Sequence, residues 1–303
     1  YGRAVAMLTV FRPGELGRVL EFGLGGGQNG QWIARSHSSV EVTTVEIDPG
    51  VVALARTHFG LETGDATEHT AGRHAAGHHT AGRHNVVVAD ARVHLRSAEG
   101  PFDMIIGDTF LASRIPEHLV TREFYEMVAE KLSPEGIFVL NIPRYTNYAI
   151  HIPKTLDSVF RHLSEIPVRG NLLLVAHDGP PPDPDRLARR VADLEARKTT
   201  QFRVTPYLDA LRDAEPDPEG IILTDGYTPV NALYAPIPRE DSAPGSGGPG
   251  AGPEDAEIEN SMPENSMLEN SVPQSDLPKT AEPENISTKT APSGTGSGPE
   301  RSQ

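Results

Sequence analysis

The chain of 303 residues carries a formal net charge of -15, has 37% apolar residues and contains no cysteine. The absence of cysteine excludes disulfide bonds, thiolate zinc sites and a cysteine nucleophile. A protein that binds nucleic acid needs a basic face for the phosphates, so the acidic balance argues against that class. No apolar run reaches the ~18 residues that a transmembrane helix requires. The first residues lack the basic region and apolar core of a signal peptide, so we expect a cytoplasmic protein without a membrane partner.

After a lead-in over residues 1–17, residues 18–48 have the layout of a nucleoside-binding βαβ unit. One apolar run predicts a strand over residues 18–22, and a second predicts the next strand over residues 41–46. A helix is expected between them, over residues 27–35. The turn after the first strand contains a cluster of glycines: Gly23, Gly25, Gly26 and Gly27. Glycine lets the backbone approach a ligand where a Cβ atom would collide, so we expect this turn to bind one.

The spacing of these glycines distinguishes two nucleoside motifs. A dinucleotide fingerprint requires a third glycine where this chain has Gln28. The pattern that fits is an acid, Glu21, followed by alternating glycines, and it is similar to the first motif of S-adenosylmethionine-dependent transferases. Glu46 ends the second strand, where a carboxylate can accept hydrogen bonds from ribose hydroxyls. A purely structural glycine turn is the alternative, but the acid after the second strand favours nucleoside binding.

A histidine-rich segment follows a helix that is predicted to begin at Pro49. Within this predicted insert, residues 62–84, the sequence HTAGRHAAGHHTAGRH repeats with a period of five residues. Imidazole is a common metal ligand, but each repeat contains a glycine and no carboxylate recurs beside the histidines. We therefore predict a low-complexity surface loop and no metal site.

The pattern of strands and helices resumes after the insert. We predict a strand from Asn85 that ends at Asp90, a helix over 93–97, a strand over 102–107 that ends at Asp108, a helix after Thr121, a turn over 134–136, a strand over 137–141, a helix over 149–163, and a β-hairpin over 166–168 and 171–176. This alternation predicts an α/β fold with a doubly wound, mostly parallel sheet that the hairpin closes.

Acidic residues end four of the predicted parallel strands: Glu21, Glu46, Asp90 and Asp108. The carboxyl ends of parallel strands meet at one edge of the sheet, where the ligands of such folds bind. A single polar residue at an exposed strand end means little. Acids from four separate strands together indicate a site.

The composition changes at the end of the predicted folded domain, residues 1–235. Helices are expected over residues 187–198 and 207–212, and residues 222–233 close this domain. Residues 236–303 consist mainly of Pro, Gly, Ser, Glu and Asn, with the repeated units ENSMP, ENSML and ENSVP. A segment with few large apolar residues cannot offset the entropy of ordering, so we predict a disordered tail.

Several segments of residues 1–233 resemble, in order and spacing, the spermidine synthase family: RVLEFGLGGG, TTVEIDPGVVALAR, VVVADARVHLR, FDMIIGDTF, EHLVTREFYEMVAEKLSPEGIFVLNI and LTDGYTPVNAL. The resemblance implies the Rossmann-like fold of S-adenosylmethionine-dependent methyltransferases. It also implies transfer of an aminopropyl group from decarboxylated S-adenosylmethionine to a polyamine such as putrescine, without a metal.

The resemblance further implies roles for individual residues. Asp108 stands where the family has its proton acceptor, and Glu46 stands where an acid holds the ribose. Asp90 and Ala91 match the segment beside the adenine. The implied donor site comprises Glu21, Gly23, Gly25, Gly26, Gly27, Gln28, Glu46, Ile47, Asp90 and Ala91.

Two positions depart from the family pattern. The family usually has a second aspartate three residues after the first, whereas Asp108 is followed by Thr109, Phe110 and Leu111. Gly26 stands where the family commonly has an aspartate that binds the donor's amine. Glu117 or Asp225 can supply a second carboxylate from elsewhere in the chain.

Three functions remain open from the sequence. The first is aminopropyl transfer, and the second is methyl transfer from intact S-adenosylmethionine, with Gln28 and Asn29 near the donor's carboxylate. The third is nucleoside binding without catalysis, and we rank them in this order. The expected partner is a small-molecule amine, and the resemblance is compatible with a homodimer. His118 can cap a helix or belong to the site, and we favour the capping role. We expect Phe124 and Tyr125 to lie in the core.

Overall fold

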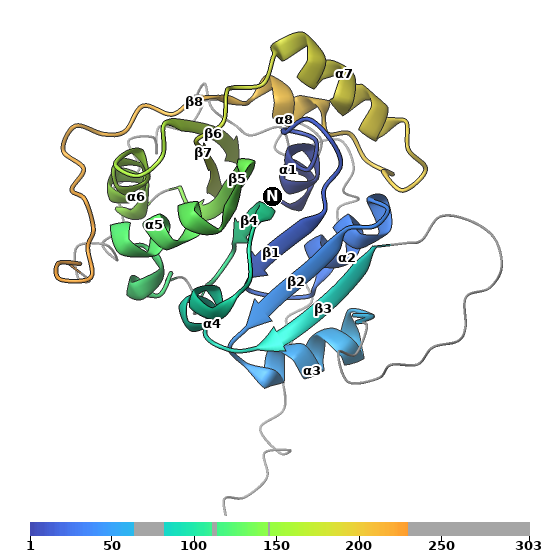
Figure 1. Cartoon of the computed structure of the whole chain (residues 1–303), viewed down its shortest axis with the longest axis horizontal. Coiled ribbons are helices and arrows are strands. Elements are labelled where there is room, and N and C mark those ends of the chain that lie inside the picture. The colour runs from blue at the N-terminus through green and yellow to red at the C-terminus, as the bar shows by residue number, and fades with distance from the viewer. Residues whose placement is uncertain (64–81, 111–113, 145, 230–303) are drawn as a thin grey trace, which may run out of the picture. The chain divides into compact units, whose positions relative to one another are not determined.

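A mostly parallel sheet of eight strands, in the order β3-β2-β1-β4-β5-β7-β6-β8, runs through the part of the chain that the structure describes (Figure 1). The structure is a computed structural model, and it describes residues 1–63, 82–110, 114–144 and 146–229. The parallel strands are β1 (Arg18–Phe22), β2 (Glu41–Glu46), β3 (Arg83–Val88), β4 (Phe102–Gly107) and β5 (Leu132–Pro143). The antiparallel strands are β6 (His162–Val168), β7 (Asn171–His177) and β8 (Arg212–Asp213).

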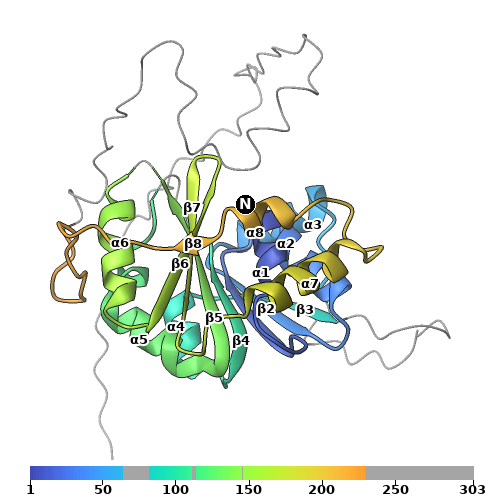
Figure 2. The same ribbon diagram turned by 90° about the horizontal axis from the view of Figure 1, so that it is seen from above.

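Helices cover both faces of the sheet, as Figure 2 shows with the strands between two helical layers. One layer contains α1 (Gly2–Leu8), α2 (Gln28–Ser36), α3 (Pro49–His58), α7 (Pro184–Glu195) and α8 (Thr205–Asp209). The other contains α4 (Ala91–Ser97), α5 (Arg122–Lys131) and α6 (Tyr148–Asp157). A short 3-10 turn, η1 (Glu117–Leu119), precedes α5.

Strand β4 shows why the sheet needs both layers. Met104 and Ile106 belong to the apolar core on the side of α1 and α2, whereas Ile105 belongs to the core on the side of α5 and α6. Successive side chains of a strand point to opposite faces, so an uninterrupted apolar run is stable only where both faces are covered. Burial of each such side chain contributes roughly 1.5–3 kcal/mol.

Two helices begin directly at the carboxyl ends of strands because an aspartate caps each of them. Asp48 Oδ1 accepts a hydrogen bond from the Gly50 N–H at 2.7 Å, and Pro49 occupies the first turn of α3. Asp90 Oδ1 accepts from the Val93 N–H at 2.9 Å and starts α4. These caps fix the chain where it leaves β2 and β3, and so they fix the edge of the sheet that carries the site.

The predicted α/β fold with a hairpin that closes the sheet is confirmed, and several predicted boundaries are wrong. The third strand begins at Arg83 instead of Asn85, so the last two residues of the predicted insert belong to β3. The helix predicted over residues 149–163 ends at Asp157, and the hairpin begins at His162. The helix predicted over residues 207–212 is α8 followed by the short strand β8.

The turn predicted over residues 134–136 lies inside β5. Phe102 of β4 pairs with Leu132, whereas Met104 pairs with Ile137, so the register shifts between these two pairs. The residues between Leu132 and Ile137 form an irregularity within a strand that begins earlier than the sequence predicts. Residues 64–81 of the histidine-rich insert and the predicted tail lie outside the described residues.

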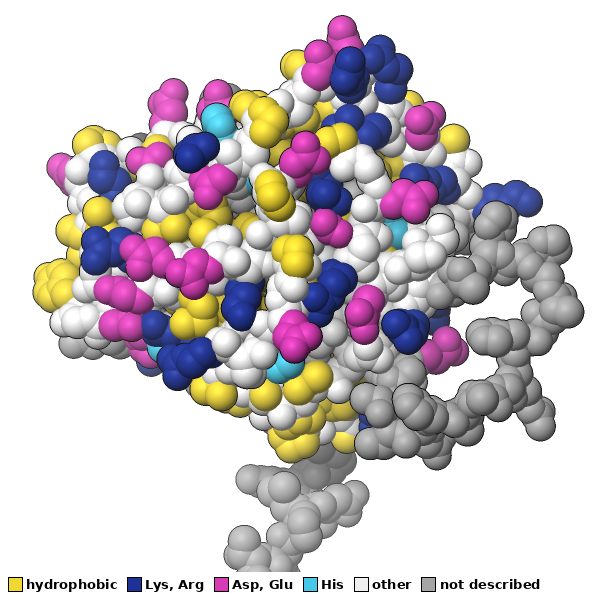
Figure 3. Space-filling view, in the orientation of Figure 1, with side chains coloured by type: hydrophobic (Ala, Val, Ile, Leu, Met, Phe, Trp, Pro, Cys, Tyr) yellow, Lys and Arg dark blue, Asp and Glu magenta, His cyan; other side chains and the backbone are white. Residues whose placement is uncertain are grey.

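Charges of both signs share the surface. On the face in Figure 3, Lys and Arg side chains are interspersed with Asp and Glu among the described residues. Exposed pairs such as Arg122 with Glu126, at 3.5 Å, contribute about 0.2–1 kcal/mol at most. None of the helices in the described part combines the length and hydropathy needed to cross a bilayer.

Candidate functional site

A cavity of about 420 Å³ opens at the carboxyl ends of the parallel strands. Its walls come from the loops after β1, β2, β3 and β4 and from the turn η1. The residues that line it are Gly23, Leu24, Gly25, Val45, Glu46, Ile47, Asp48, Val51, Ala89, Asp90, Ala91, Asp108, Thr109, Phe110, Pro116, His118 and Leu119. Segments distant in sequence thus form one site at the edge where doubly wound sheets bind ligands.

The glycine turn contacts the loop after β4 at one glycine and is open to the cavity at another. Gly23 has φ +91°, and a Cβ atom there would lie 2.2 Å from the carbonyl oxygen of Asp108. The turn therefore packs directly on the backbone that carries Asp108. Gly25 has φ +51°, and a Cβ atom there would meet no heavy atom within 4 Å, which leaves its backbone open to the cavity.

The Glu46 carboxylate joins the glycine turn to the end of β2. Its Oε2 accepts a hydrogen bond from the Leu24 N–H and its Oε1 accepts one from the Asp48 N–H, each at 3.0 Å. A carboxylate oxygen can accept more than one hydrogen bond, so both oxygens retain capacity toward hydroxyl donors in the cavity. Ile47 follows on the cavity wall with 65% of the residue exposed, which offers an apolar surface to a planar ring.

Asp90 and His118 form the opposite wall. Asp90 Oδ2 lies 2.9 Å from His118 Nε2, while Oδ1 caps α4. Burial opposes ionisation of Asp90, but the hydrogen bond from the Val93 N–H and the contact with His118 outweigh it and lower the pKa of this carboxyl. The expectation that His118 caps a helix is wrong, because its imidazole contacts Asp90 and lines the cavity.

Two donors from different parts of the chain hold the Asp108 carboxylate. Asn141 of β5 donates to Oδ1 at 2.8 Å, and the Tyr1 hydroxyl donates to Oδ2. Burial, and then the negative charge of Asp108, raise the pKa of the Tyr1 hydroxyl, which therefore keeps its proton. The carboxylate is thus fixed at the cavity wall as an acceptor.

Four of the predicted donor residues do not line the cavity: Glu21, Gly26, Gly27 and Gln28. Glu21 points into the protein, where it is 2% exposed. Gly26 lies against the ring of Phe59, and Gly27 begins α2 against Leu61. The Gln28 amide donates to the carbonyls of Gly26 and Phe59, each at 3.4 Å. Glu21 points away from the cavity within β1, and α2 begins directly after the turn, so Gly27 and Gln28 leave the opening.

The prediction also missed residues that the structure places beside Asp108. Asn141 interrupts the apolar run of residues 137–142 in β5, and this is a signal that the sequence offers. Tyr1 has no such signal, because its contact with Asp108 depends on how α1 packs. The core positions of Phe124 and Tyr125 are confirmed by their burial.

Asp225 makes a structural contact and does not line the cavity. Its oxygens accept two hydrogen bonds from Arg92, at 2.7 and 2.6 Å, and one from Thr121 at 2.7 Å. The Arg92 contact is the main reason that the pKa of Asp225 is lowered. This pair holds the segment around Asp225 against α4 and the start of α5. Neither Asp225 nor Glu117 lines the cavity.

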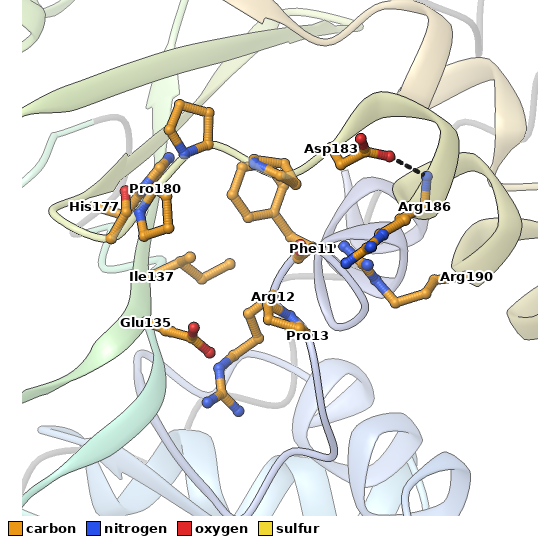
Figure 4. Close-up of a pocket in the computed structure, with 13 residues that line it drawn as sticks. Phe11, Arg12, Pro13, Glu135, Ile137, His177, Pro180, Asp183, Arg186 and Arg190 are labelled. Carbon is orange, nitrogen blue, oxygen red and sulfur yellow. Dashed lines mark hydrogen bonds between the residues drawn. The ribbon is translucent and has the colours of Figure 1, made fainter.

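A second cavity of about 230 Å³ lies at the opposite edge, beside the first residues of β5 (Figure 4). Two of its arginines hold the N-terminal segment in place. Arg190 donates to the carbonyls of Val10 and Phe11, each at 2.8 Å, and Arg12 pairs with Asp103 at 3.2 Å. These contacts anchor the segment between α1 and β1 and so hold α1 in place.

The described residues contain no group of three or more His, Cys, Asp or Glu side chains placed to hold a metal ion. The chemistry available in the larger cavity is that of carboxylates and backbone groups around an apolar floor. Such a site can bind hydroxyls and a cation and can accept a proton.

Residues 4–165 match the family model described as the spermine/spermidine synthase domain. A polyamine aminopropyltransferase of Vibrio vulnificus is 28% identical over 241 residues, which cover 77% of this chain and 75% of that protein. A polyamine aminopropyltransferase of Neisseria meningitidis is 28% identical over 204 residues, which cover 64% of this chain and 70% of that protein.

Solved structures show the same fold. Spermidine synthase from Thermotoga maritima matches with a TM-score of 0.52 and 20% identity over 71% of each chain. A spermidine synthase in complex with the transition-state analogue AdoDATO matches with a TM-score of 0.54 and 21% identity over 71% of this chain and 72% of that one. The predicted fold and transferase class are confirmed, and the chain belongs to the spermine/spermidine synthase domain family.

Proposed function

We propose that this chain transfers the aminopropyl group of decarboxylated S-adenosylmethionine to a small-molecule amine, with putrescine as the first acceptor to test. The observation that carries the proposal is the position of Asp108, held by Tyr1 and Asn141 at the wall of a cavity beside the glycine turn. The names of the matched relatives support the same reaction.

The proposed donor site uses the residues that meet at the cavity. The ribose hydroxyls would donate to Glu46, and the adenine would lie between Ile47 and the segment of Asp90 and Ala91. The backbone of Gly25 is open on this side, so the sulfonium end can pass close to the turn. A volume of about 420 Å³ falls within the range of small-ligand pockets.

The reaction then needs little from the protein. The amine nitrogen attacks the carbon beside the sulfonium, a C–N bond forms, and the C–S bond breaks with its electrons on sulfur, which leaves methylthioadenosine. A free alkylamine has a pKa of about 10.4 if it behaves like lysine, so it arrives as an ammonium ion and must lose protons. Asp108 attracts the ammonium and accepts a proton. Alignment of the two reactants supplies much of the remaining rate enhancement.

Titration calorimetry with decarboxylated and intact S-adenosylmethionine, followed by a transfer assay with putrescine, tests the proposal. We expect tighter binding of the decarboxylated donor and formation of methylthioadenosine only when an amine is present. Asp108→Asn is expected to lower kcat by roughly 10²–10⁴-fold. Asp157→Asn, the same change at an exposed position of α6, serves as the control.

The competing functions predict other results. Methyl transfer requires tighter binding of intact S-adenosylmethionine and release of S-adenosylhomocysteine. A non-catalytic role requires donor binding without turnover of any amine. The homodimer that the resemblance suggests stays a prediction, and sedimentation equilibrium measures it directly.

A further inference from the structure

A chain of hydrogen bonds runs behind the glycine turn from Asp108 into the sheet. The Tyr1 hydroxyl donates to Asp108 and accepts a hydrogen bond from Asn29 Nδ2 at 2.6 Å. The same Asn29 nitrogen donates to Glu21 Oε1 at 3.2 Å. Thr44 Oγ1 donates to Glu21 Oε2 at 2.7 Å. Glu21 therefore reaches Asp108 through only two intervening side chains.

Asn29 determines which groups donate and which accept in this series of hydrogen bonds. Its amide group has two hydrogens, and the contacts with Tyr1 and Glu21 use one each. The Tyr1 oxygen accepts from Asn29, and the Tyr1 hydroxyl donates its own hydrogen to Asp108. The amide orientation is itself fixed by Glu21, which has only acceptor atoms when ionised.

Glu21 is a buried carboxyl with no cation among its hydrogen-bond partners. Burial raises its pKa to about 7, and the negative charge of Asp108 acts in the same direction, while the bonds from Thr44 and Asn29 oppose both. The titratable groups near it are Asp108, Tyr1 and His84, whose Nε2 lies 2.8 Å from Thr44 Oγ1. Burial lowers the pKa of His84 to about 4, so this ring is neutral at neutral pH.

We propose that Glu21 and Asn29 are positioning residues of the transferase site that act on Asp108 through Tyr1 without contacting the donor. Asn29 orients the Tyr1 hydroxyl, and Glu21 orients Asn29. When ionised, Glu21 also places a second negative charge behind Asp108. This charge comes from β1, whereas the family usually has a second aspartate in the loop after β4. This inference rests on the proposed function, since Asp108 must be the group that receives the proton.

The charge of Glu21 has a consequence for the pH dependence of the reaction. Ionised Glu21 makes the binding of an ammonium ion at Asp108 more favourable, because a second negative charge nearby attracts the same cation. The pH profile of kcat/KM should therefore contain a rise near pH 7 in addition to the slope from deprotonation of the free amine.

Glu21→Gln and Asn29→Ala are the informative variants, and a matched pair on β2 provides the control. Thr44→Val removes the hydroxyl that donates to Glu21, whereas Thr43→Val makes the same change at the adjacent position.

We expect Glu21→Gln to lose the rise near pH 7 and to bind the donor within about twofold of wild type. Asn29→Ala should lower kcat by roughly 10–10²-fold with an unchanged KM for the donor. The physical reason is that a catalytic group such as Asp108 loses rate on this scale when it is misplaced by ~1 Å. Thr44→Val should keep the rise but move it to higher pH, because the bond from Thr44 lowers the pKa of Glu21, and Thr43→Val should resemble wild type.

Two results overturn the inference. One is that Glu21→Gln has the wild-type pH profile and Asn29→Ala has the same kcat as the control Thr43→Val. Glu21 and Asn29 then do not act on Asp108. If both variants lose donor binding, Glu21 contacts the donor, as the glycine motif alone suggests.

A readout independent of turnover separates this inference from the proposed function. The ring ¹³Cζ resonance of Tyr1, assigned with Tyr1→Phe, reports the hydrogen bonds of its hydroxyl. It should move in Asn29→Ala and stay in place in Thr43→Val, even if the wild-type chain transfers no aminopropyl group. An unchanged resonance in Asn29→Ala contradicts the positioning role, whereas an inactive wild type with a shifted resonance contradicts only the proposed function.

Discussion

Two features of the structure require glycine at position 23, its backbone conformation and its contact with Asp108. Its φ of +91° is unfavourable for a side chain, and its missing Cβ leaves room for the carbonyl oxygen of Asp108. A positive φ at a non-glycine residue costs about 1–3 kcal/mol, whereas a clash with backbone forces the neighbouring loop to move. The second effect is specific to this position and acts on the group that is proposed to receive the proton.

Gly23→Ala is therefore expected to lower the free energy of unfolding and to abolish donor binding. Gly170→Ala provides a matched control, because Gly170 has φ +73° and a Cβ atom there would meet nothing within 4 Å. Urea unfolding should show a loss of about 1 kcal/mol in the control and a larger loss in Gly23→Ala. Donor binding by calorimetry should persist in Gly170→Ala. Equal effects of the two substitutions on binding would show that the contact with Asp108 is unimportant.

Glu21 makes stability depend on pH in a direction that follows from its raised pKa. Its pKa in the folded protein is about 7 against an ordinary value of 4.5, so the folded state holds this proton more tightly than the unfolded state. The stabilisation is complete below pH 4.5 and is lost as the pH rises through 7. A shift of this size corresponds to about 3 kcal/mol at most.

Glu21→Gln should remove this dependence. The free energy of unfolding of the variant relative to wild type is expected to increase between pH 4.5 and 8, by up to about 3 kcal/mol. Urea unfolding at pH 5, 6, 7 and 8 measures it. Glu15→Gln removes a charge at an exposed position and should leave the profile unchanged. A constant difference between Glu21→Gln and wild type at all four pH values would contradict the prediction.

At the scale of elements, the cap of α4 combines stability with the shape of the cavity. Asp90 caps this helix with one oxygen and contacts His118 with the other. Asp183 caps α7 in the same way, through the Arg186 N–H at 2.8 Å, but it lies at the opposite edge of the sheet. The two aspartates therefore share a local role and differ in their surroundings.

Asp90→Ala and Asp183→Ala should each lower the free energy of unfolding by about 1 kcal/mol. Only Asp90→Ala should also weaken donor binding, by roughly tenfold, because it removes a wall residue and releases His118. Thermal unfolding and calorimetry on both variants give the comparison. If Asp183→Ala weakened binding equally, the effect of Asp90 would come from general stability.

The sequence predicts the elements that depend on local pattern and fails where packing between distant segments decides. The apolar run of β4 and the helix start at Pro49 are local, and the structure has a strand and a helix there. The start of β3 is decided by tertiary contacts, since His84 is buried beside Thr44. A histidine within a repeat carries no local sign of that burial.

The same limit applies to the site. The alternation of glycines and the acids at strand ends identify the correct edge of the sheet. They do not distinguish Glu46, which lines the cavity, from Glu21, which lies beneath it. That difference arises because Glu21 precedes the last residue of β1 and points into the layer between β1 and α2, while Glu46 is the last residue of β2.

At the scale of the whole molecule, the segment around Leu223 closes the core on the side of α5 and α6. Leu223 is fully buried, its carbonyl accepts from the Arg122 N–H at 2.8 Å, and Asp225 pairs with Arg92. Among the described residues, the buried core ends at Leu223. The core therefore needs the chain to continue past α8 and β8.

Two truncations test where the folded unit ends. A chain of residues 1–235 should have the same Tm as the full chain, and a donor at 100 times its Kd should add about 2.7 kcal/mol to the free energy of unfolding of both. A chain of residues 1–213 lacks Leu223 and the partner of Arg92, and removal of one buried leucine alone costs about 2–5 kcal/mol. It should melt at a lower temperature and gain less from the donor. Calorimetric scans with and without the donor give all six values. A lower Tm for residues 1–235 than for the full chain would mean that residues 236–303 contribute to the fold, contrary to the predicted boundary.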